Sequence, residues 1–256
     1  MNILLFFPSE VGSDGSIRVS RDDPRAKHIR GVLRLSRGSW VRAGIVDEGT
    51  GMAEVRNDPV AAGETSLELR FVEDDAVQPE VLPRIDLILG SVRPIQLKRL
   101  FRDLAAIGVS RISVAGTDLS EASYFHSSIW NSETLQQLLV QGASQGGHTC
   151  LPELTRFRSV GEAIVAYEKN GDYAAEEAVA RIRLERGAQP AAAALPNINS
   201  RRIVLAIGPE RGFTNRETAL LEEAGFLALG IPAGILRTET AATAAVCIVR
   251  SWGAGA

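Results

Sequence analysis

Strands and helices alternate along the chain after residue 83, and this alternation constrains the fold more than any other feature. Residues 85–89 form a continuous apolar run, which is typical of a strand buried on both faces of a sheet. Pro94 then begins a predicted helix, whose apolar residues recur at helical spacing until Gly108 ends it. Further strands are expected at residues 112–115, 202–207 and 227–231, and further helices at residues 133–143 and 238–252. The pattern predicts an α/β fold with a parallel sheet covered by helices on both faces.

Capping signals add two helix starts to this pattern. Ser159 and Glu162 form one predicted capping box, and Thr214 and Glu217 form a second, whose helix ends at Gly225. Residues 178–184 fit either a strand or the end of a helix. Residues 189–200 are rich in alanine, proline and asparagine, and we expect a surface loop there.

The first eighty residues follow a different pattern. Short apolar segments at residues 3–7, 39–45 and 66–72 are separated by clusters of glycine, aspartate, asparagine and proline, and only residues 24–33 suit a helix. An acidic stretch with two prolines follows at residues 74–83. We therefore predict a small barrel-like domain over residues 1–73 and an α/β domain over residues 82–256.

Composition limits the classes of function. The formal net charge is −3, so nucleic acid would have to bind a local basic patch rather than a basic molecule. The longest apolar runs fall short of a membrane span, and the apolar N-terminus predicts a first strand rather than a secretion signal. Two cysteines at unrelated spacing predict neither a disulfide framework nor a metal site. We expect a cytoplasmic protein without metal or membrane partners.

Two glycine-containing loops follow predicted strands, where ligands of open α/β sheets bind. One covers residues 208–213, and the other runs from Gly230 into the last helix. Their glycines permit close approach of the backbone to a ligand, and Glu210, Arg237 and Glu239 add charge to an otherwise apolar region. Either loop taken alone is equally well explained as a capped turn.

Three motifs together resemble one enzyme family. Residues 207–213 read IGPERGF, similar to the GPEGGF signature of bacterial small-subunit ribosomal RNA uracil-N3 methyltransferases. Residues 235–241 read ILRTETA, similar to that family's ILRxETA segment. Residues 28–35 read HIRGVLRL and precede Gly38, which resembles the HxxxVLRxxxGD stretch of the family's PUA-like domain. The order and spacing of the motifs extend the resemblance over the whole chain.

The resemblance implies a SPOUT fold, in which a C-terminal α/β domain carries a deep trefoil knot and an N-terminal PUA-like β-barrel contacts RNA. It implies that the protein is a homodimer and that its partner is ribosomal RNA or the small ribosomal subunit. The implied reaction is N3-methylation of a uridine with S-adenosylmethionine as cofactor. The positions that match the cofactor loops are Gly208, Pro209, Glu210, Gly212, Ile231, Leu236, Arg237, Thr238 and Ala241.

The chemistry suggests roles for two charged residues. Uracil N3 carries a proton and becomes nucleophilic only when that proton leaves, so a base or a cation near the carbonyl oxygens is required. We predict Arg237 as the catalytic cation and Glu239 as the catalytic group that orients the base or accepts its proton. The alternative is an ion pair between Arg237 and Glu239 that holds the knot.

Basic residues gather in one short stretch of the first domain. RNA phosphate contacts explain this cluster in a chain that is acidic overall, and a solvated helix face is the alternative. The predicted RNA-binding residues are Arg25, Lys27, His28, Arg30, Arg34 and Arg37.

Several positions depart from the family's pattern. Ala106 replaces an acid, Ser144 and His148 replace an acid and an arginine, and Arg211, Pro232 and Gly234 alter the two cofactor loops. These departures leave open a retargeted or non-catalytic homologue that acts as an RNA-binding module. Residues 142–146 also match the G-x-S-x-G elbow of α/β-hydrolases. That fold needs its histidine well downstream of the serine, after an acid, and His148 lies too close to Ser144, so the sequence argues against a hydrolase.

Overall fold

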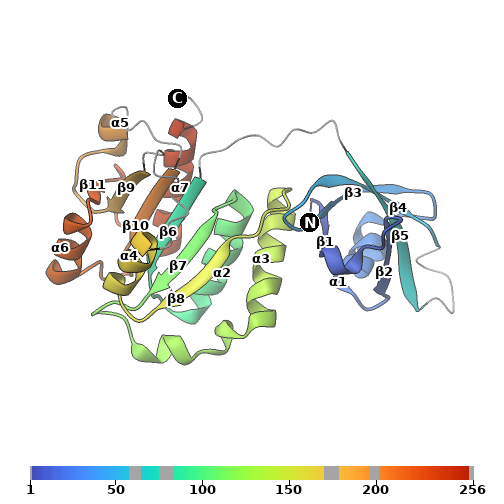
Figure 1. Ribbon diagram of the computed structural model, residues 1–256, viewed down its shortest axis with the longest axis horizontal. Helices are drawn as coiled ribbons and strands as arrows, with labels where there is room; N and C mark the ends of the chain where they lie inside the picture. The colour runs from blue at the N-terminus through green and yellow to red at the C-terminus, as the bar shows by residue number, and fades with distance from the viewer. Residues whose placement is uncertain (1, 58–64, 75–83, 170–178, 196–201, 254–256) are drawn as a thin grey trace. The chain divides into compact units, whose positions relative to one another are not determined.

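The computed structural model describes residues 2–57, 65–74, 84–169, 179–195 and 202–253 (Figure 1). The chain forms two compact units. Unit 1 comprises Met1–Pro79 together with Ala143–Leu151, and unit 2 comprises Glu80–Gly142 and Pro152–Ala256. Unit 1 thus includes a short segment that the sequence analysis assigned to the second domain.

Unit 1 is built on a five-stranded sheet with the strand order β1-β3-β4-β5-β2. The strands are β1 (Leu4–Phe6), β2 (Ser16–Ser20), β3 (Trp40–Ile45), β4 (Thr50–Val55) and β5 (Ser66–Glu73). β1 and β3 are parallel, and the other pairs are antiparallel. The expected strands at 3–7, 39–45 and 66–72 are confirmed, whereas β2 and β4 were not predicted.

One face of this sheet buries the core of unit 1. In β2 the side chains alternate between exposed and buried, as a strand with one solvated face requires. Phe6, Ile17 and Leu69 are almost fully buried there, together with Ile29. The predicted helix at 24–33 divides into α1 (Pro24–His28) and a π-helical turn η2 (Ile29–Leu33), which carries Ile29 into the core; a short 3-10 turn, η1 (Pro8–Glu10), precedes them.

Unit 2 contains a six-stranded, fully parallel sheet with the order β11-β9-β10-β6-β7-β8. Its strands are β6 (Arg84–Gly90), β7 (Arg111–Ala115), β8 (Glu153–Phe157), β9 (Val179–Leu184), β10 (Arg202–Ile207) and β11 (Leu227–Leu229). The predicted parallel sheet is confirmed, and residues 178–184 prove to hold a strand rather than a helix end. β8 was not predicted, because only two residues of Glu-Leu-Thr-Arg-Phe are apolar.

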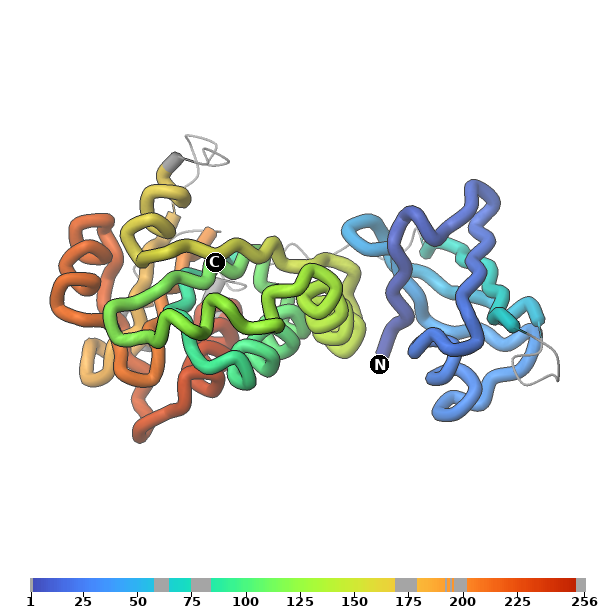
Figure 2. The backbone as a smooth tube through the Cα atoms, turned by 90° about the horizontal axis from the view of Figure 1, so that it is seen from below, coloured from blue at the N-terminus to red at the C-terminus, as the bar shows by residue number. Residues whose placement is uncertain are grey.

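Helices cover both faces of this sheet. The helices after residue 83 are α2 (Pro94–Ile107), α3 (Ser132–Gly146), α4 (Val160–Lys169), α5 (Ala191–Ala194), α6 (Asn215–Glu223) and α7 (Thr238–Gly253), with 3-10 turns η3 (Ala122–His126) and η4 (Ser128–Trp130). α4 and α6 pack on one face through Ile164 and Leu221, while α2 and α7 contact each other on the opposite side (Figure 2). α5 lies within the stretch expected to be a loop. None of the described helices is long and apolar enough to cross a membrane.

Because all six strands are parallel, they end at one edge of the sheet, which we call the carboxyl edge. The loops that follow the strands gather there, as ligand loops of open α/β sheets do. The opposite edge, where the strands begin, is the amino edge.

Candidate active site

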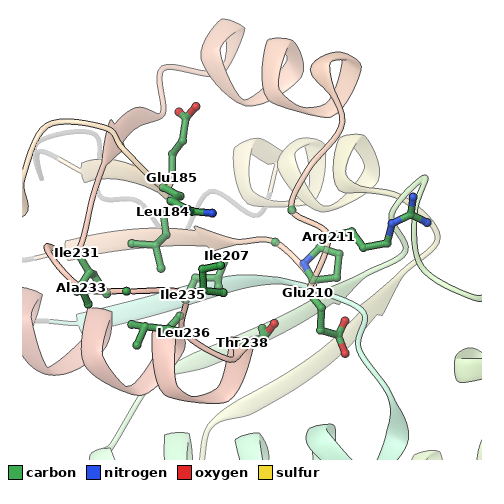
Figure 3. Close-up of a pocket in the computed structure, with 16 residues that line it drawn as sticks. Leu184, Glu185, Ile207, Glu210, Arg211, Ile231, Ala233, Ile235, Leu236 and Thr238 are labelled. Atoms are coloured by element: carbon green, nitrogen blue, oxygen red, sulfur yellow. The ribbon is translucent and has the colours of Figure 1, made fainter.

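A cavity of about 380 Å³ lies at the carboxyl ends of β9, β10 and β11, and we call it the first cavity (Figure 3). Leu184 and Ile207 are the last residues of β9 and β10, and their side chains form apolar wall (Figure 3). The full lining consists of Leu184, Glu185, Arg186, Ile207, Gly208, Pro209, Glu210, Arg211, Gly212, Ile231, Ala233, Gly234, Ile235, Leu236, Thr238 and Ala241.

The loop after β10 folds tightly upon itself. A Cβ atom on Gly208 would lie 3.0 Å from the Cα of Gly212, so this approach leaves no comfortable room for a side chain. Gly212 has a φ of 73°, in the left-handed region that glycine adopts without strain, and its N–H donates to the Pro209 carbonyl at 2.8 Å. The two glycines therefore bring backbone, rather than side chains, to this wall of the cavity.

A capping box fixes the far end of this loop, as predicted. The Thr214 N–H donates to Glu217 Oε2 at 2.9 Å, and the Glu217 N–H donates to Thr214 Oγ1 at 3.3 Å. The same Glu217 carboxylate accepts the Asp118 N–H at 2.9 Å, and Glu217 is only 2% exposed. One buried carboxylate thereby connects the start of α6 to the loop that follows β7.

The loop after β11 forms the opposite wall. Ile231 and Leu236 lie on the side of the cavity facing Leu184 and Ile207 (Figure 3). The loop ends at Thr238, which is 5% exposed and begins α7. Apolar side chains therefore contribute to both walls, beside the charged lining residues Glu185, Arg186 and Glu210.

A second cavity, of about 490 Å³, adjoins the first and has a different chemical character. The two cavities share Glu210, Ile235, Leu236 and Thr238. The rest of the second lining consists of Arg93, Ile95, Gln96, Arg99, Arg237 and Glu239. Three arginines and two glutamates thus face a space beside the first cavity.

Glu239 is held by residues of α2. Gln96 Nε2 donates to Glu239 Oε2 at 3.4 Å, and the Arg99 guanidinium lies 3.9 Å from Glu239 Oε1. Gln96 Oε1 also accepts the Arg93 N–H at 3.2 Å, which fixes the amide's orientation at the start of the helix. Within the described part of the chain, Glu239 pairs with Arg99 and not with Arg237, whose exposed guanidinium has no ion pair there.

Comparison with known proteins adds to this geometry. Residues 79–250 match the family model described as the RNA methyltransferase domain. A protein named ribosomal RNA small subunit methyltransferase E from Treponema pallidum (strain Nichols) is 34% identical over 250 residues, which cover 97% of this chain and 90% of the relative. The chain belongs to this RNA methyltransferase family. The family resemblance inferred from three motifs is thereby confirmed.

Other relatives of this RNA methyltransferase extend the comparison over its full length. Ribosomal RNA small subunit methyltransferase E 1 from Borreliella burgdorferi (strain ATCC 35210 / DSM 4680 / CIP 102532 / B31) is 29% identical over 252 residues, covering 98% of both chains. A Neisseria gonorrhoeae ribosomal RNA small subunit methyltransferase E, solved bound to S-adenosyl methionine, aligns with a TM-score of 0.72 at 22% identity, covering 97% of each chain. A Legionella pneumophila putative methyltransferase, solved with the cofactor SAM, aligns at 0.74 and 19%, covering 98% of each. At these identities the solved structures show a shared fold.

The predicted cofactor residues of this methyltransferase come together in the first cavity. Eight of them line it: Gly208, Pro209, Glu210, Gly212, Ile231, Leu236, Thr238 and Ala241. Arg237 instead lines the second cavity, together with the predicted catalytic Glu239. Sequence reasoning missed Leu184, Glu185 and Arg186, although the carboxyl end of β9 is where the strand-end rule would have placed ligand residues.

The departures from the family's pattern do not block the first cavity. Arg211 stands at its rim with its side chain directed away from the space (Figure 3), and Pro232 is not among the lining residues. Gly234 does line the cavity. Ala106, Ser144 and His148 line neither cavity, and the Ser144 hydroxyl donates to the Ile3 carbonyl within unit 1.

The predicted RNA-binding residues of unit 1 differ in their surroundings. Arg25 binds Glu10 and Asp23 at 2.6 and 2.7 Å, donates to the Leu5 carbonyl and covers the Phe6 ring, so its guanidinium serves the fold. The remaining members differ in exposure. Lys27, Arg34 and Arg37 are exposed, while His28 and Arg30 are half-buried. Among the described residues, no group of three or more His, Cys, Asp or Glu side chains is placed to hold a metal ion.

Proposed function

We propose that this chain transfers the methyl group of S-adenosylmethionine to N3 of a uridine in small-subunit ribosomal RNA. The main support for this proposal is that the first and second cavities adjoin and share lining residues. Methyl transfer requires such an arrangement, because the methyl donor and the RNA base must be held next to each other. The names of the relatives support ribosomal RNA as the partner.

The first cavity suits S-adenosylmethionine in size and lining. Ligand cavities are predominantly apolar, with a few placed polar groups, and a volume of about 380 Å³ lies in their usual range. Leu184, Ile207 and Leu236 offer an apolar slot for the adenine, and the 208–212 backbone offers polar groups to the rest of the molecule. When bound, the cofactor supplies an electrophilic methyl group on a sulfonium.

The second cavity suits the uracil. Loss of the N3 proton leaves a negative charge that is shared by N3 and the two flanking carbonyl oxygens. The N3–C bond then forms as the S–C bond breaks, which would give a neutral methylated base and release the cofactor as a thioether. Arg237 stabilises that charge, and Glu239, held by Gln96 and Arg99, orients the base or accepts its proton. These are the two catalytic residues of the proposal.

The proposal includes a homodimer and an RNA-binding unit 1 of the PUA-like type. Ile95 and Ile235 line the second cavity and are 63% and 81% exposed, so a second copy that covers them would also exclude water from the reaction. In unit 1, Val32 and Trp40 are exposed beside Arg34 and Arg37, which is a suitable combination for RNA. The trefoil knot follows from the same family resemblance.

Calorimetry with S-adenosylmethionine tests cofactor binding. We expect the wild type to bind, and Leu236→Gln to bind about tenfold more weakly or worse, because the substitution places an amide in the apolar wall. Leu227→Gln is the matched control, since Leu227 is 60% exposed on β11 and lines neither cavity. If the wild type does not bind S-adenosylmethionine at millimolar concentration, the proposed methyltransferase activity is refuted, and the alternative of a non-catalytic RNA-binding homologue is favoured.

Mass spectrometry of nucleosides tests the target. Small-subunit RNA from a strain lacking the protein is incubated with enzyme and S-adenosylmethionine and then digested. The proposal expects 3-methyluridine at one position; a different methylated nucleoside would identify a retargeted enzyme.

A further inference from the structure

A third cavity, of about 720 Å³, lies at the carboxyl ends of β7 and β8 in unit 2. It shares no lining residue with the first two cavities. Its lining consists of Gly116, Thr117, Ser120, Glu121, Ala122, Phe125, His126, Arg156, Phe157 and Arg158. The cavity therefore combines aromatic rings with cationic and hydrogen-bonding side chains.

Its aromatic wall is already fixed without a ligand. The Phe125 ring stacks on Trp130, with centroids 6.2 Å apart and planes 15° apart. The Arg156 guanidinium lies 4.8 Å from the Trp130 centroid and donates to the Phe125 carbonyl at 3.2 Å. The Trp130 indole N–H donates to the Tyr124 carbonyl at 2.9 Å. Phe125 lines the cavity and Trp130 does not, so the part of Phe125 that borders the cavity is not covered by Trp130.

The cationic side is open to solvent. Arg158 is exposed, and its backbone N–H donates to Glu162 at 2.8 Å, which anchors the residue just after the end of β8. A Cβ atom on Gly116 would lie 2.3 Å from the Arg158 carbonyl oxygen, so the contact between the residues that follow β7 and β8 leaves no room for a side chain at position 116. This contact holds the arginine beside the aromatic wall.

The third cavity lies on the same edge of the sheet as the proposed active site. The first cavity is at β9, β10 and β11, the second adjoins α2 after β6, and the third is at β7 and β8, which follow β6 in the sheet. The Asp118 N–H bond to Glu217 and the Arg216–Asp118 ion pair join the loop after β7 to the start of α6. A strand of RNA on this edge would pass from one site to the other.

We propose that the third cavity binds an unpaired nucleotide that neighbours the modified one in the RNA. Its base stacks on Phe125, Arg158 contacts a phosphate, and the exposed Glu121 carboxylate, which accepts the Tyr124 hydroxyl at 3.2 Å, has further lone pairs for the base edge. Single-stranded RNA is recognised by this combination of aromatic stacking and arginine contacts. The inference rests on the proposed function, because it takes RNA to be the substrate.

Fluorescence anisotropy with two labelled oligomers tests this site. One is a single-stranded RNA octamer, and the other has the same length and charge but abasic sugars. The wild type should prefer the octamer with bases by about 5- to 100-fold, the range expected for one stacked base. Phe125→Leu should lose most of that preference, whereas Arg158→Gln should weaken binding of both oligomers several-fold. Arg102→Gln, which removes an exposed charge of α2 outside the cavity, should change neither affinity.

Phe125→Leu with the wild-type preference for bases would overturn the proposal. If that variant fails to fold by circular dichroism, cross-linking of 4-thiouridine RNA to the wild type decides instead. A cross-linked peptide within residues 121–130 supports the site, and cross-links confined to other peptides overturn it. Loss of base preference in Phe125→Leu, without methyl transfer to any RNA by the wild type, would refute the proposed reaction while supporting this site.

Discussion

The two edges of the parallel sheet in unit 2 use their charged residues differently. At the amino edge, Arg202 and Asp86 are 2% and 0% exposed and lie 2.8 Å apart, and Arg111 pairs with Glu153 at 2.8 Å. At the carboxyl edge, Arg93, Arg158 and Arg237 are exposed and line cavities. Charges at the amino edge bind each other across strands, whereas these three arginines of the carboxyl edge face cavities and are available to ligands. The edges therefore separate stability from the proposed chemistry.

Breaking the amino-edge pair should have the largest effect. Asp86→Ala removes the carboxylate that lies 2.8 Å from the buried Arg202 guanidinium, so we expect the free energy of unfolding to fall by about 3–5 kcal/mol. Urea denaturation measures this change. Methyl transfer per folded molecule should stay near the wild-type value.

A double variant sharpens the same test. Asp86→Leu with Arg202→Met replaces the pair with apolar side chains and should recover most of the lost stability. A double variant as unstable as Asp86→Ala would show that stability at this edge depends on the ion pair itself, rather than on the loss of one of its two partners.

Removing a cation at the carboxyl edge should instead lower activity and leave stability almost unchanged. Arg237→Ala should lower kcat for RNA methylation by about 100-fold or more, the loss typical of one group that stabilises developing charge. The free energy of unfolding should change by less than about 0.5 kcal/mol, because the side chain is exposed. Wild-type turnover by Arg237→Ala would remove it from the catalytic residues.

Arg25 extends the comparison to unit 1, where a cation again serves the fold. Burial raises the pKa of Glu10 and Asp23, but side-chain hydrogen bonds from Arg25, backbone hydrogen bonds and the charge of Arg25 together outweigh it, so both pKa values lie below their ordinary 4.5 and 3.8. Lowered folded-state pKa values stabilise the fold above those ordinary values, and the stabilisation is lost as pH falls through the folded-state values. Arg25→Gln should lose about 2 kcal/mol at pH 7 and show a flatter decline below pH 4. Urea denaturation at both pH values checks this; parallel pH profiles would contradict it.

Arg211→Gly should have the smallest effect. This change restores the glycine of the family signature, but the Arg211 side chain points away from the first cavity (Figure 3). Calorimetry should give an S-adenosylmethionine affinity within about twofold of the wild type, a difference below 0.5 kcal/mol. A tenfold change would show that the arginine acts on the cofactor after all.

The sequence predicted the buried parts of unit 2 well, because burial on both faces leaves a long apolar run. The run at 85–89 predicted β6, and the Thr214–Glu217 capping box predicted the start of α6. The edge strand β8 escaped notice, since edge strands bury less and tolerate Glu153 and Arg156. β9 was ambiguous for a related reason: Arg181 and Arg183 interrupt its apolar pattern.

Local sequence motifs predicted those parts of the candidate site that are contiguous in sequence. The glycine loop and the segment before α7 were found because each is contiguous in sequence. Arg93, Gln96 and Arg99 complete the second cavity from a helix more than a hundred residues upstream of Arg237, and no local pattern connects them. The ion pair between Arg25 and Glu10 could not be predicted from a local pattern, because the two residues are brought together only when the chain folds.

The shared carboxylate of Glu217 has a thermodynamic consequence. It fixes the loop after β7 and the end of the cofactor loop together, so a ligand that orders one loop reduces the entropy lost when the other is ordered. Thermodynamic linkage then makes the effect reciprocal. The factor by which bound S-adenosylmethionine raises the affinity for RNA equals the factor by which bound RNA raises the affinity for S-adenosylmethionine. Titrations of each ligand with and without the other measure that factor, and Glu217→Gln should bring it toward one.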